Sequence, residues 1–347
     1  MPYWPLRLPQ APQNRGLSLS KVLVLGSNSF GATHLIDDLL TGNSKVIGIS
    51  RSRLKSSQFL VYRENAKYQN FSFHQIDIVN ESDQLFKLIE RESPEFVVDF
   101  AGQGMVAESW DDPSAWYQTN ILSKVKLLEY LRQQKSIQKY IRISTPEVYG
   151  DSEKEISESS SFNPSTPYAL SHATIDAHLH LLHSRYGFPS VIGRFANFYG
   201  EGQQLFRIIP KTFIKFKRGD KLQLHGGGSS KRAFIHGLDI SSGIQKLVTL
   251  ARVGNTYHFS TNELFSIKEV VQLIGDRLQL PWENLIENVE DRPGKDNQYF
   301  MDVSKSRNEL GWSPRVNFTE GLGKVHSWIE ANFDDLSASS LEYRHAQ

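Results

Sequence analysis

The sequence predicts a doubly wound α/β fold, in which helices cover both faces of a mostly parallel sheet. Short β-branched runs alternate with helical patterns, which is typical of βαβ units. A glycine ends the first run just before a helix begins, and hydroxyl and carboxylate residues follow a later apolar run. In open α/β sheets, ligands bind at the carboxyl ends of the strands. The later part of the chain predicts a smaller α/β subdomain.

The chain has 347 residues, enough for one large α/β domain or two domains. We expect an N-terminal extension over residues 1–20, which contain four prolines. A cofactor domain that also carries the catalytic residues is expected over 21–195, a mainly substrate-binding subdomain over 196–332, and a tail over 333–347. No low-complexity linker separates the two larger parts, so we expect their chains to be interleaved.

The composition argues against several classes of function. Hydrophobic residues make up 39% and charged residues 22%, as in ordinary globular proteins. The formal net charge of +1 gives no electrostatic case for binding nucleic acid or an anionic membrane. There is no cysteine, no apolar run of the ~20 residues that span a bilayer, and no apolar core of a signal peptide in the first twenty residues. We therefore expect a cytoplasmic protein.

The first three elements form a strand–turn–helix–strand unit. An apolar run over 21–26 precedes helical spacing over 30–40, Thr41 to Asn43 stop that helix, and a second run covers 45–50. Glycine in the turn after the first strand lets the backbone approach a pyrophosphate, which then lies at the helix N-terminus. The unit therefore predicts a dinucleotide site.

Later elements follow from the same periodicities. Further strands are expected over 71–76, 95–103, 140–143, 190–195 and 256–260. Helices are expected over 113–134, 167–186, 211–218, 239–250, 266–278 with Ser266 as N-cap, and 318–332.

The first turn resembles the GxxGxxG turn of the extended short-chain dehydrogenase/reductase superfamily, which has a Rossmann-type sheet. The pattern falls on Gly26, Ser29 and Ala32, so only the first glycine is kept. The resemblance implies that Gly26, Ser29 and Phe30 contact the dinucleotide.

Two arginines follow the second strand, where an acid would favour NAD and an arginine favours NADP. Arg51 and Arg53 stand there without an acid, and their guanidinium groups suit a 2′-phosphate. We expect NADP in preference to NAD, with a solvated basic loop as the alternative. The resemblance also implies cofactor contacts at four later positions: Asp77, Ile78, Ala101 and Gln103. It further implies that Asn120 orders the backbone of the site.

The catalytic candidates are Thr145 and Glu147, after the strand over 140–143, and Tyr168 at the start of the next long helix. They resemble the Thr, Glu and Tyr of the nucleoside-diphosphate-sugar 4,6-dehydratases, a group that includes dTDP-glucose and GDP-mannose dehydratases. The resemblance implies that Tyr168 takes a proton from the sugar hydroxyl at carbon 4 during hydride transfer. Thr145 would bond that hydroxyl, and Glu147 would remove the proton at carbon 5.

The site departs from the pattern at two further positions. His172 stands where the group has a lysine whose charge lowers the tyrosine pKa. The resemblance implies that His172, like that lysine, bonds the nicotinamide ribose. A histidine is only partly protonated near neutrality, so we expect weaker formation of the phenolate. Pro146 stands where dTDP-glucose enzymes have an acid, so Glu147 or a water would have to protonate the departing hydroxyl.

The second half of the chain is expected to hold a nucleoside-diphosphate sugar. The resemblance places Asn197 at the sugar diphosphate, and it brings together Arg207, Arg232 and Arg292, whose planar groups suit a pyrophosphate. The helices over 113–134 and 167–186 resemble the pair through which relatives dimerise as a four-helix bundle, so we expect a homodimer.

Three alternatives stay open from the sequence. A sugar-nucleotide epimerase or decarboxylase could use the same scaffold, and the departures at Ser29, Ala32, Pro146 and His172 would also fit a non-catalytic sugar-nucleotide-binding protein. A metal site is conceivable on one helix face, but a solvated face is favoured and we expect no metal. The residues concerned are Asp176, His178, His180 and His183.

Overall fold

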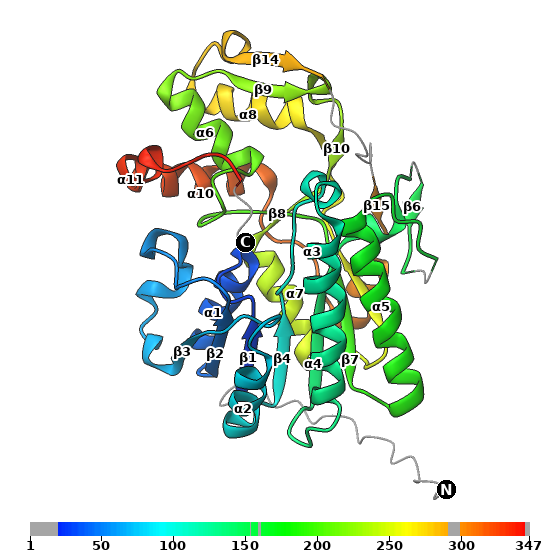
Figure 1. Ribbon diagram of the computed structural model, residues 1–347. Helices are drawn as coiled ribbons and strands as arrows, with labels where there is room; N and C mark the ends of the chain where they lie inside the picture. The colour runs from blue at the N-terminus through cyan, green and yellow to red at the C-terminus, as the bar shows by residue number, and fades with distance from the viewer. Residues whose placement is uncertain (1–19, 153, 159–160, 291–298, 344–347) are drawn as a thin grey trace, which may run out of the picture.

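The computed structural model describes residues 20–152, 154–158, 161–290 and 299–343. At its centre lies a seven-stranded sheet in the order β12-β7-β5-β4-β1-β2-β3, and every pair of neighbours is parallel (Figure 1). This is the predicted doubly wound sheet. Its strands are β1 (Lys21–Leu25), β2 (Lys45–Ser50), β3 (Phe71–Gln75), β4 (Phe96–Asp99), β5 (Lys139–Ser144), β7 (Ser190–Phe195) and β12 (Thr256–Phe259).

Alternate residues of each central strand enter two different hydrophobic cores. Val22 and Val24 of β1 pack with α1 (Phe30–Thr41) and α7 (Gly237–Thr249), whereas Leu23 and Leu25 pack with the helices of the opposite face. Because both faces are covered, every residue of β5 and β7 is buried, including the charged Lys139, Arg142 and Arg194. The helices of the second face are α2 (Ser82–Glu92), α4 (Ser123–Leu131) and α5 (Pro167–Tyr186).

Helix α5 has the predicted bounds because both of its ends carry stop signals. Thr166 accepts a hydrogen bond from the backbone N–H of Ala169 at 3.1 Å, and Pro167 occupies the first helical position. Gly187 ends the helix in the left-handed conformation at φ +67°. These caps place Tyr168 in the first turn.

The helix expected over 113–134 is not continuous. Short α3 (Pro113–Tyr117) and α4 are joined by a π-helical turn over Gln118–Leu122, which adds a residue to the helical repeat. Such turns often lie at functional sites. This one carries the buried side chain of Asn120.

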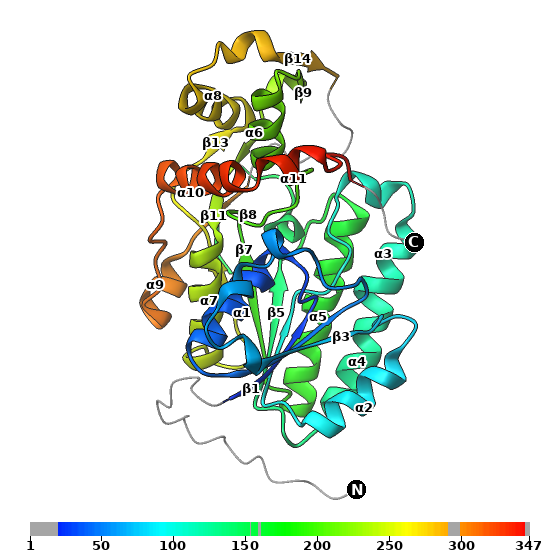
Figure 2. The same ribbon diagram turned by 90° about the vertical axis from the view of Figure 1, so that its left-hand side faces the viewer.

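A smaller layer lies beyond the carboxyl ends of the sheet strands (Figures 1 and 2). Its own hydrophobic core joins α6 (Ile208–Arg218), α8 (Ile267–Leu278) and the parallel pair of β9 (Leu222–His225) and β14 (Ile286–Val289). Ser266 caps α8 as predicted, in a reciprocal capping box with Glu269.

Several short strands and C-terminal helices connect the two layers. Helices α10 (Phe318–Ala331) and α11 (Phe333–Ala338) lie between them, as Figure 2 shows. The stretch over 333–347, which was expected to be a tail, begins with helix α11. Its residues Leu336 and Leu341 are buried in the core of the smaller layer, which explains why this stretch is ordered into a helix. The remaining elements are β6 (Glu155–Ile156), β8 (Asn197–Tyr199), β10 (Lys231–Arg232), β11 (Phe234–His236), β13 (Phe265–Ser266), β15 (Phe300–Met301) and α9 (Ser304–Leu310). Within the part of the chain that the structure describes, no helix is long and apolar enough to cross a membrane.

Candidate active site

The turn after β5 brings Thr145 and Glu147 together. Thr145 caps a short 3-10 helix over Pro146–Tyr149, and its Oγ1 accepts a hydrogen bond from the backbone N–H of Glu147 at 3.3 Å. Pro146 occupies the first helical position, where its missing N–H is no loss. The turn therefore holds the hydroxyl and the carboxylate at the carboxyl end of the central strand.

Tyr168 joins this pair from the first turn of α5. Its backbone N–H donates to the Oγ of Ser109 at 3.2 Å. Its phenol lies near enough to the Thr145 side chain for Thr145 to lower the pKa of Tyr168. The ring of His172, one helical turn further on, lies 4.6 Å from the Tyr168 ring between centroids. The structure thus brings together all four predicted catalytic side chains.

Burial raises the pKa of Tyr168 above its ordinary value, and the negative charge of Glu147 raises it further. The Thr145 side chain and the positive charges of Arg207 and Arg142 act in the opposite direction. The protein therefore contains both the groups that hold the phenol protonated and the groups that favour its ionisation. Ionisation of Tyr168 depends on the nearby positive charge.

His172 differs from the expectation of partial protonation. Burial lowers the pKa of His172 well below its usual range, and the neighbouring Arg142, Lys124 and Arg194 lower it further. The Nη2 of Arg142 donates to the Nδ1 of His172 at 3.2 Å, a contact that imidazolium could not accept. The lowered pKa and the contact with Arg142 both favour a neutral imidazole over the partly protonated one expected from the sequence.

Asn120 connects three separate segments beneath the site. Its Oδ1 accepts from the backbone N–H of Gln103 at 2.8 Å, and its Nδ2 donates to the Gln103 carbonyl at 3.1 Å and to the Oγ of Ser171 at 2.9 Å. Asn120 therefore joins the backbone of Gln103 to α5, and its role in ordering the site stays a prediction. The buried Gln103 is held by its backbone, next to the start of α5.

The turn after β1 has the geometry of a dinucleotide cradle. Gly26 has φ +74°, and an added Cβ would lie 2.7 Å from the backbone nitrogen of Ala101. Ser29 begins α1 as its N-cap, and its buried Oγ has no hydrogen-bond partner among the described residues. The Phe30 side chain packs in the core, which leaves its backbone at the helix N-terminus. A close backbone approach, a helix N-terminus and an unpartnered hydroxyl fit a pyrophosphate.

The remaining predicted cofactor residues lie after the neighbouring strands. Arg51 and Arg53 are exposed beyond β2. Asp77 uses both carboxylate oxygens locally, accepting from the backbone of Val79 at 2.9 Å and from Asn80 at 3.0 Å. The partly buried Ile78 and Ala101 pack against the core that contains α2, α4 and α5.

Tyr299 links two of the predicted substrate residues. Its hydroxyl donates to the Oδ1 of Asn197 at 2.9 Å, and the Arg232 guanidinium lies over its ring at 5.0 Å from the centroid. Arg207 lies exposed at the start of α6, near enough to lower the pKa of Tyr168 by its charge. Tyr299 was missed from the sequence because no motif surrounds it. Arg292 lies outside the described residues.

The helix face considered for a metal is engaged in other contacts. Asp176 is fully buried and pairs with the Nη2 of Arg194 at 3.0 Å, whereas the Nδ1 of His183 lies 3.0 Å from the carbonyl oxygen of Phe188. Across residues 20–152, 154–158, 161–290 and 299–343, no group of three His, Asp or Glu side chains could hold a metal ion.

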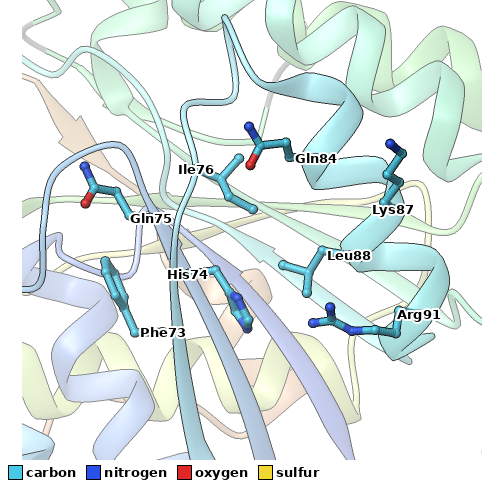
Figure 3. Close-up of a pocket in the computed structure, with 8 residues that line it drawn as sticks. All are labelled: Phe73, His74, Gln75, Ile76, Gln84, Lys87, Leu88 and Arg91. Carbon is cyan, nitrogen blue, oxygen red and sulfur yellow. The ribbon is translucent and has the colours of Figure 1, made fainter.

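A surface depression between β3 and α2 lies elsewhere in the fold (Figure 3). Strands β4, β1 and β2 separate β3 from β5, so this depression is distinct from the candidate active site. It is lined by Phe73, His74, Gln75, Ile76, Gln84, Lys87, Leu88 and Arg91.

Comparisons with known proteins agree with this geometry. The family described as GDP-mannose 4,6 dehydratase matches residues 23–325. The dTDP-D-glucose 4,6-dehydratase of Homo sapiens is 32% identical over 320 residues, covering 90% of this chain and 91% of that protein.

Two solved structures have the same fold. The dTDP-glucose 4,6-dehydratase of Streptomyces venezuelae, with NAD bound, has a TM-score of 0.84 and 27% identity, covering 90% of this chain and 98% of the other. The enzyme of the same name from Bacillus anthracis, in complex with NAD, has a TM-score of 0.81 and 28% identity, covering 91% and 98%. The chain therefore belongs to the GDP-mannose 4,6-dehydratase family, and it is a nucleoside-diphosphate-sugar 4,6-dehydratase of the extended short-chain dehydrogenase/reductase type.

Proposed function

We propose that this enzyme converts dTDP-glucose to its 4-keto-6-deoxy derivative, with NAD as its cofactor. The observation that carries the reaction assignment is the group of Thr145, Glu147 and Tyr168 at the carboxyl end of β5, in which Thr145 contacts both other residues. The choice of dTDP-glucose is supported by relatives named for that substrate in Homo sapiens, Streptomyces venezuelae and Bacillus anthracis.

The preference for NADP expected from Arg51 and Arg53 gains no support from the two solved relatives, which hold NAD. Titration calorimetry with NAD and NADP tests the choice between the cofactors. We expect tighter binding of NAD, and we expect Arg51→Ala with Arg53→Ala to change NAD affinity by less than about threefold. If the protein instead binds NADP more tightly, and the two substitutions abolish that preference, NADP would be the cofactor, as expected from the sequence.

The residues of the site divide the proton transfers between them. When bound, NAD would supply an oxidised nicotinamide able to accept hydride from carbon 4 of the sugar and to give it back at carbon 6. Tyr168 takes the proton of the hydroxyl at carbon 4, and Thr145 hydrogen-bonds the same oxygen. The resulting ketone acidifies the proton at carbon 5, which Glu147 removes while hydroxide leaves carbon 6 as water. When carbon 6 receives hydride, carbon 5 takes a second proton, which reaches it from solvent through Glu147. Tyr168 releases to solvent the proton that it took from the hydroxyl at carbon 4, so the enzyme ends unchanged.

The departing hydroxide needs a proton that Pro146 cannot give. Glu147 lies on the same 3-10 turn and gains a proton from carbon 5, so it is the group that can protonate the leaving oxygen. Under this assignment one carboxylate acts as base and then as acid. Glu147→Gln should therefore stop elimination and leave oxidation at carbon 4 intact, which stopped-flow absorbance of the reduced cofactor would reveal as a single turnover.

Three residues are proposed to hold the diphosphate and sugar of the substrate within the described part of the chain. Asn197 and Arg232 are brought together by Tyr299, and Arg207 lies near Tyr168. Arginine pairs two phosphate oxygens at once, so Arg207→Met and Arg232→Met should each raise KM at least about tenfold. Arg277→Met, which removes an arginine that donates to the carbonyl of Thr319, is the matched control.

A homodimer through the face of α4 and α5 is part of the proposal. Leu170 and Leu181 are three helical turns apart on α5 and are 45% and 67% exposed, and Leu122 on the adjoining π turn is 58% exposed. An apolar face of this kind suits a second copy of the same surface. Leu181→Glu should give monomers in sedimentation velocity, whereas Leu250→Glu, at the end of α7, should leave the dimer intact.

The reaction is tested by incubating the protein with NAD and a panel of dTDP-, UDP-, GDP- and CDP-sugars, followed by mass spectrometry. Loss of one water from dTDP-glucose is expected, and Tyr168→Phe should abolish it. Loss from another sugar nucleotide would correct the substrate. A mass-neutral isomer would identify an epimerase, and loss of carbon dioxide would identify a decarboxylase. Binding without turnover, detected as a raised melting temperature, would identify a non-catalytic binding protein.

A further inference from the structure

A cluster of charged side chains is buried directly beneath Tyr168, on the sheet face covered by α4 and α5. Arg142 of β5 lies at its centre, between Asp99 of β4 and Asp176 of α5. Lys124 of α4 and Arg194 of β7 complete the cluster. All five side chains are at most 1% exposed.

The carboxylates are shared among the cations. Asp99 pairs with the Nζ of Lys124 at 2.5 Å and with the Nη1 of Arg142 at 3.5 Å. Asp176 pairs with the Nη2 of Arg194 at 3.0 Å, and its other oxygen lies 4.0 Å from the Nε of Arg142. Arg142 thus has the longer contacts to both acids, and its positive charge is the least compensated of the three.

The charges of this cluster do not balance. Three cations face two carboxylates. His172, which contacts Arg142, is neutral because burial lowers its pKa well below its usual range. His258, which bonds the same Tyr149 hydroxyl as Arg194, is neutral because burial lowers its pKa to about 3. One positive charge is therefore in excess. It lies close to Tyr168, because His172 contacts both the Arg142 guanidinium and the Tyr168 ring.

The contact between Arg142 and His172 also fixes the tautomer of the imidazole. Arginine has only donors, so the Nη2 of Arg142 donates and the Nδ1 of His172 accepts. A neutral imidazole that accepts at Nδ1 carries its proton on Nε2. His172 therefore offers an N–H donor at Nε2.

We propose that Arg142 and His172 divide between them the work of a single cation beside Tyr168. Arg142 is a positioning residue: its guanidinium, which does not lose its proton in the working pH range, supplies the permanent positive charge that favours the phenolate. Its hydrogen bond holds His172 as the Nε2–H tautomer, whose donor is available to a hydroxyl of the cofactor ribose. The inference rests on the proposed role of Tyr168 as the base.

Other titratable groups face Arg142 and His172 from the surrounding elements. Tyr140 of β5 donates to Asp99 at 2.5 Å, and burial raises its pKa far above the ordinary value, so it stays neutral. Burial lowers the pKa of Lys124 to about 8, although Asp99 opposes that change. Loss of the Lys124 proton at alkaline pH would remove one charge from the cluster. Arg142 would keep its charge, so the donor at His172 would persist.

Nitrogen-15 NMR of the histidine side chains tests the tautomer without any turnover. His172→Asn assigns the His172 signals by their loss, in the free protein and with saturating NAD. We expect a pyridine-type Nδ1 and a pyrrole-type Nε2 that stay unchanged from about pH 5.5 to 9. Protonation of both nitrogens in that range, or a proton on Nδ1, would overturn the proposal.

Two variants separate the charge of Arg142 from its hydrogen bond. Arg142→Lys keeps a positive charge and a donor, whereas Arg142→Gln keeps a donor alone. The pKa of Tyr168 is read from the ultraviolet difference titration of each protein against its own Tyr168→Phe partner. We expect a rise of at least one pH unit in Arg142→Gln, and kcat about tenfold lower at neutral pH with KM little changed. Arg142→Lys should restore most of both values.

The two measurements distinguish this inference from the proposed function. The pKa of Tyr168 could stay unshifted in a folded Arg142→Gln protein, with kcat lowered equally at every pH. That result would show that Arg142 is merely structural and would refute the proposal that its charge favours the phenolate. If Arg142→Gln does not fold, Arg142→Lys and the NMR of the wild-type protein still decide, because loss of the tautomer would refute the inference. Absence of dehydratase turnover together with the expected tautomer and titration would count against the proposed function alone.

Discussion

Gly26 at the end of β1 offers a direct test of the dinucleotide cradle. Its φ of +74° is a conformation that L-amino acids rarely adopt, and an added Cβ would lie 2.7 Å from the Ala101 nitrogen and 2.9 Å from the carbonyl carbon of Phe100. Both neighbours are backbone atoms, which cannot move without displacing the end of β4. Gly187 after α5 has a similar φ of +67° and no atom within 4 Å of an added Cβ. It is therefore a matched control.

The two substitutions should differ by the cost of the steric overlap. Each alanine in the left-handed conformation costs about 1–2 kcal/mol of unfolding free energy. Gly26→Ala adds the cost of displacing packed backbone, about 1–3 kcal/mol, as for overpacked cores. We therefore expect a loss of about 1–2 kcal/mol for Gly187→Ala and about 2–5 kcal/mol for Gly26→Ala.

Urea unfolding of both variants and the wild-type protein measures these costs, and titration calorimetry measures NAD affinity. NAD should bind Gly26→Ala at least about tenfold more weakly, because the turn that faces the pyrophosphate has moved. NAD should bind Gly187→Ala with unchanged affinity. Equal losses of stability in the two variants, with NAD affinity retained by Gly26→Ala, would refute the argument that this turn is a close-approach cradle.

Three further predictions concern the site and the charges beneath it. Tyr168→Phe should lower kcat at least about a thousandfold and leave NAD and substrate affinities within a few-fold, since it removes a proton acceptor and little volume; weakened binding by calorimetry would contradict this. Asp176→Asn should lower the free energy of unfolding in urea by about 3–5 kcal/mol, because it leaves buried guanidinium charge uncompensated. The control Asp220→Asn, at an exposed ion pair, should lower it by less than about 1 kcal/mol. Burial lowers the pKa of His258 to about 3, whereas its ordinary pKa in the unfolded chain is about 6.5. The contribution of His258 to the free energy of unfolding is therefore complete above about pH 6.5. Below that value the unfolded chain binds the proton first, and the free energy of unfolding falls by about 1.4 kcal/mol per pH unit until about pH 3. His258→Gln should flatten the pH dependence of unfolding in that window by this amount, and an unchanged slope would show that His258 is protonated in the native state.

The local signals of the sequence were enough to predict much of the fold. Helix α5 has the expected ends, since Thr166, Pro167 and Gly187 are strong caps. The capping box of Ser266 is also present. The π turn over Gln118–Leu122 could not be predicted, because one extra residue within a helix barely changes the hydrophobic pattern.

The site was predictable only where a motif surrounds the residue. Thr145, Glu147 and Tyr168 belong to short patterns, and the structure brings them together. Arg142 was read as part of an apolar run, since sequence periodicity shows that a residue is buried but not which charge it meets. Tyr299 joins Asn197 to Arg232 across about a hundred residues of sequence, a contact that the order of the chain does not reveal.

The position of β12 in the sheet has a consequence during protein synthesis. This strand completes the sheet beside β7, yet α6, β9 and α7 are translated between the two. While they emerge from the ribosome, β7 presents an apolar strand with unpaired backbone groups, a form prone to aggregation. A fragment that stopped at Phe195 would keep this open edge permanently. The nascent enzyme therefore depends on the arrival of Thr256–Phe259, or on a chaperone that shields β7 until then.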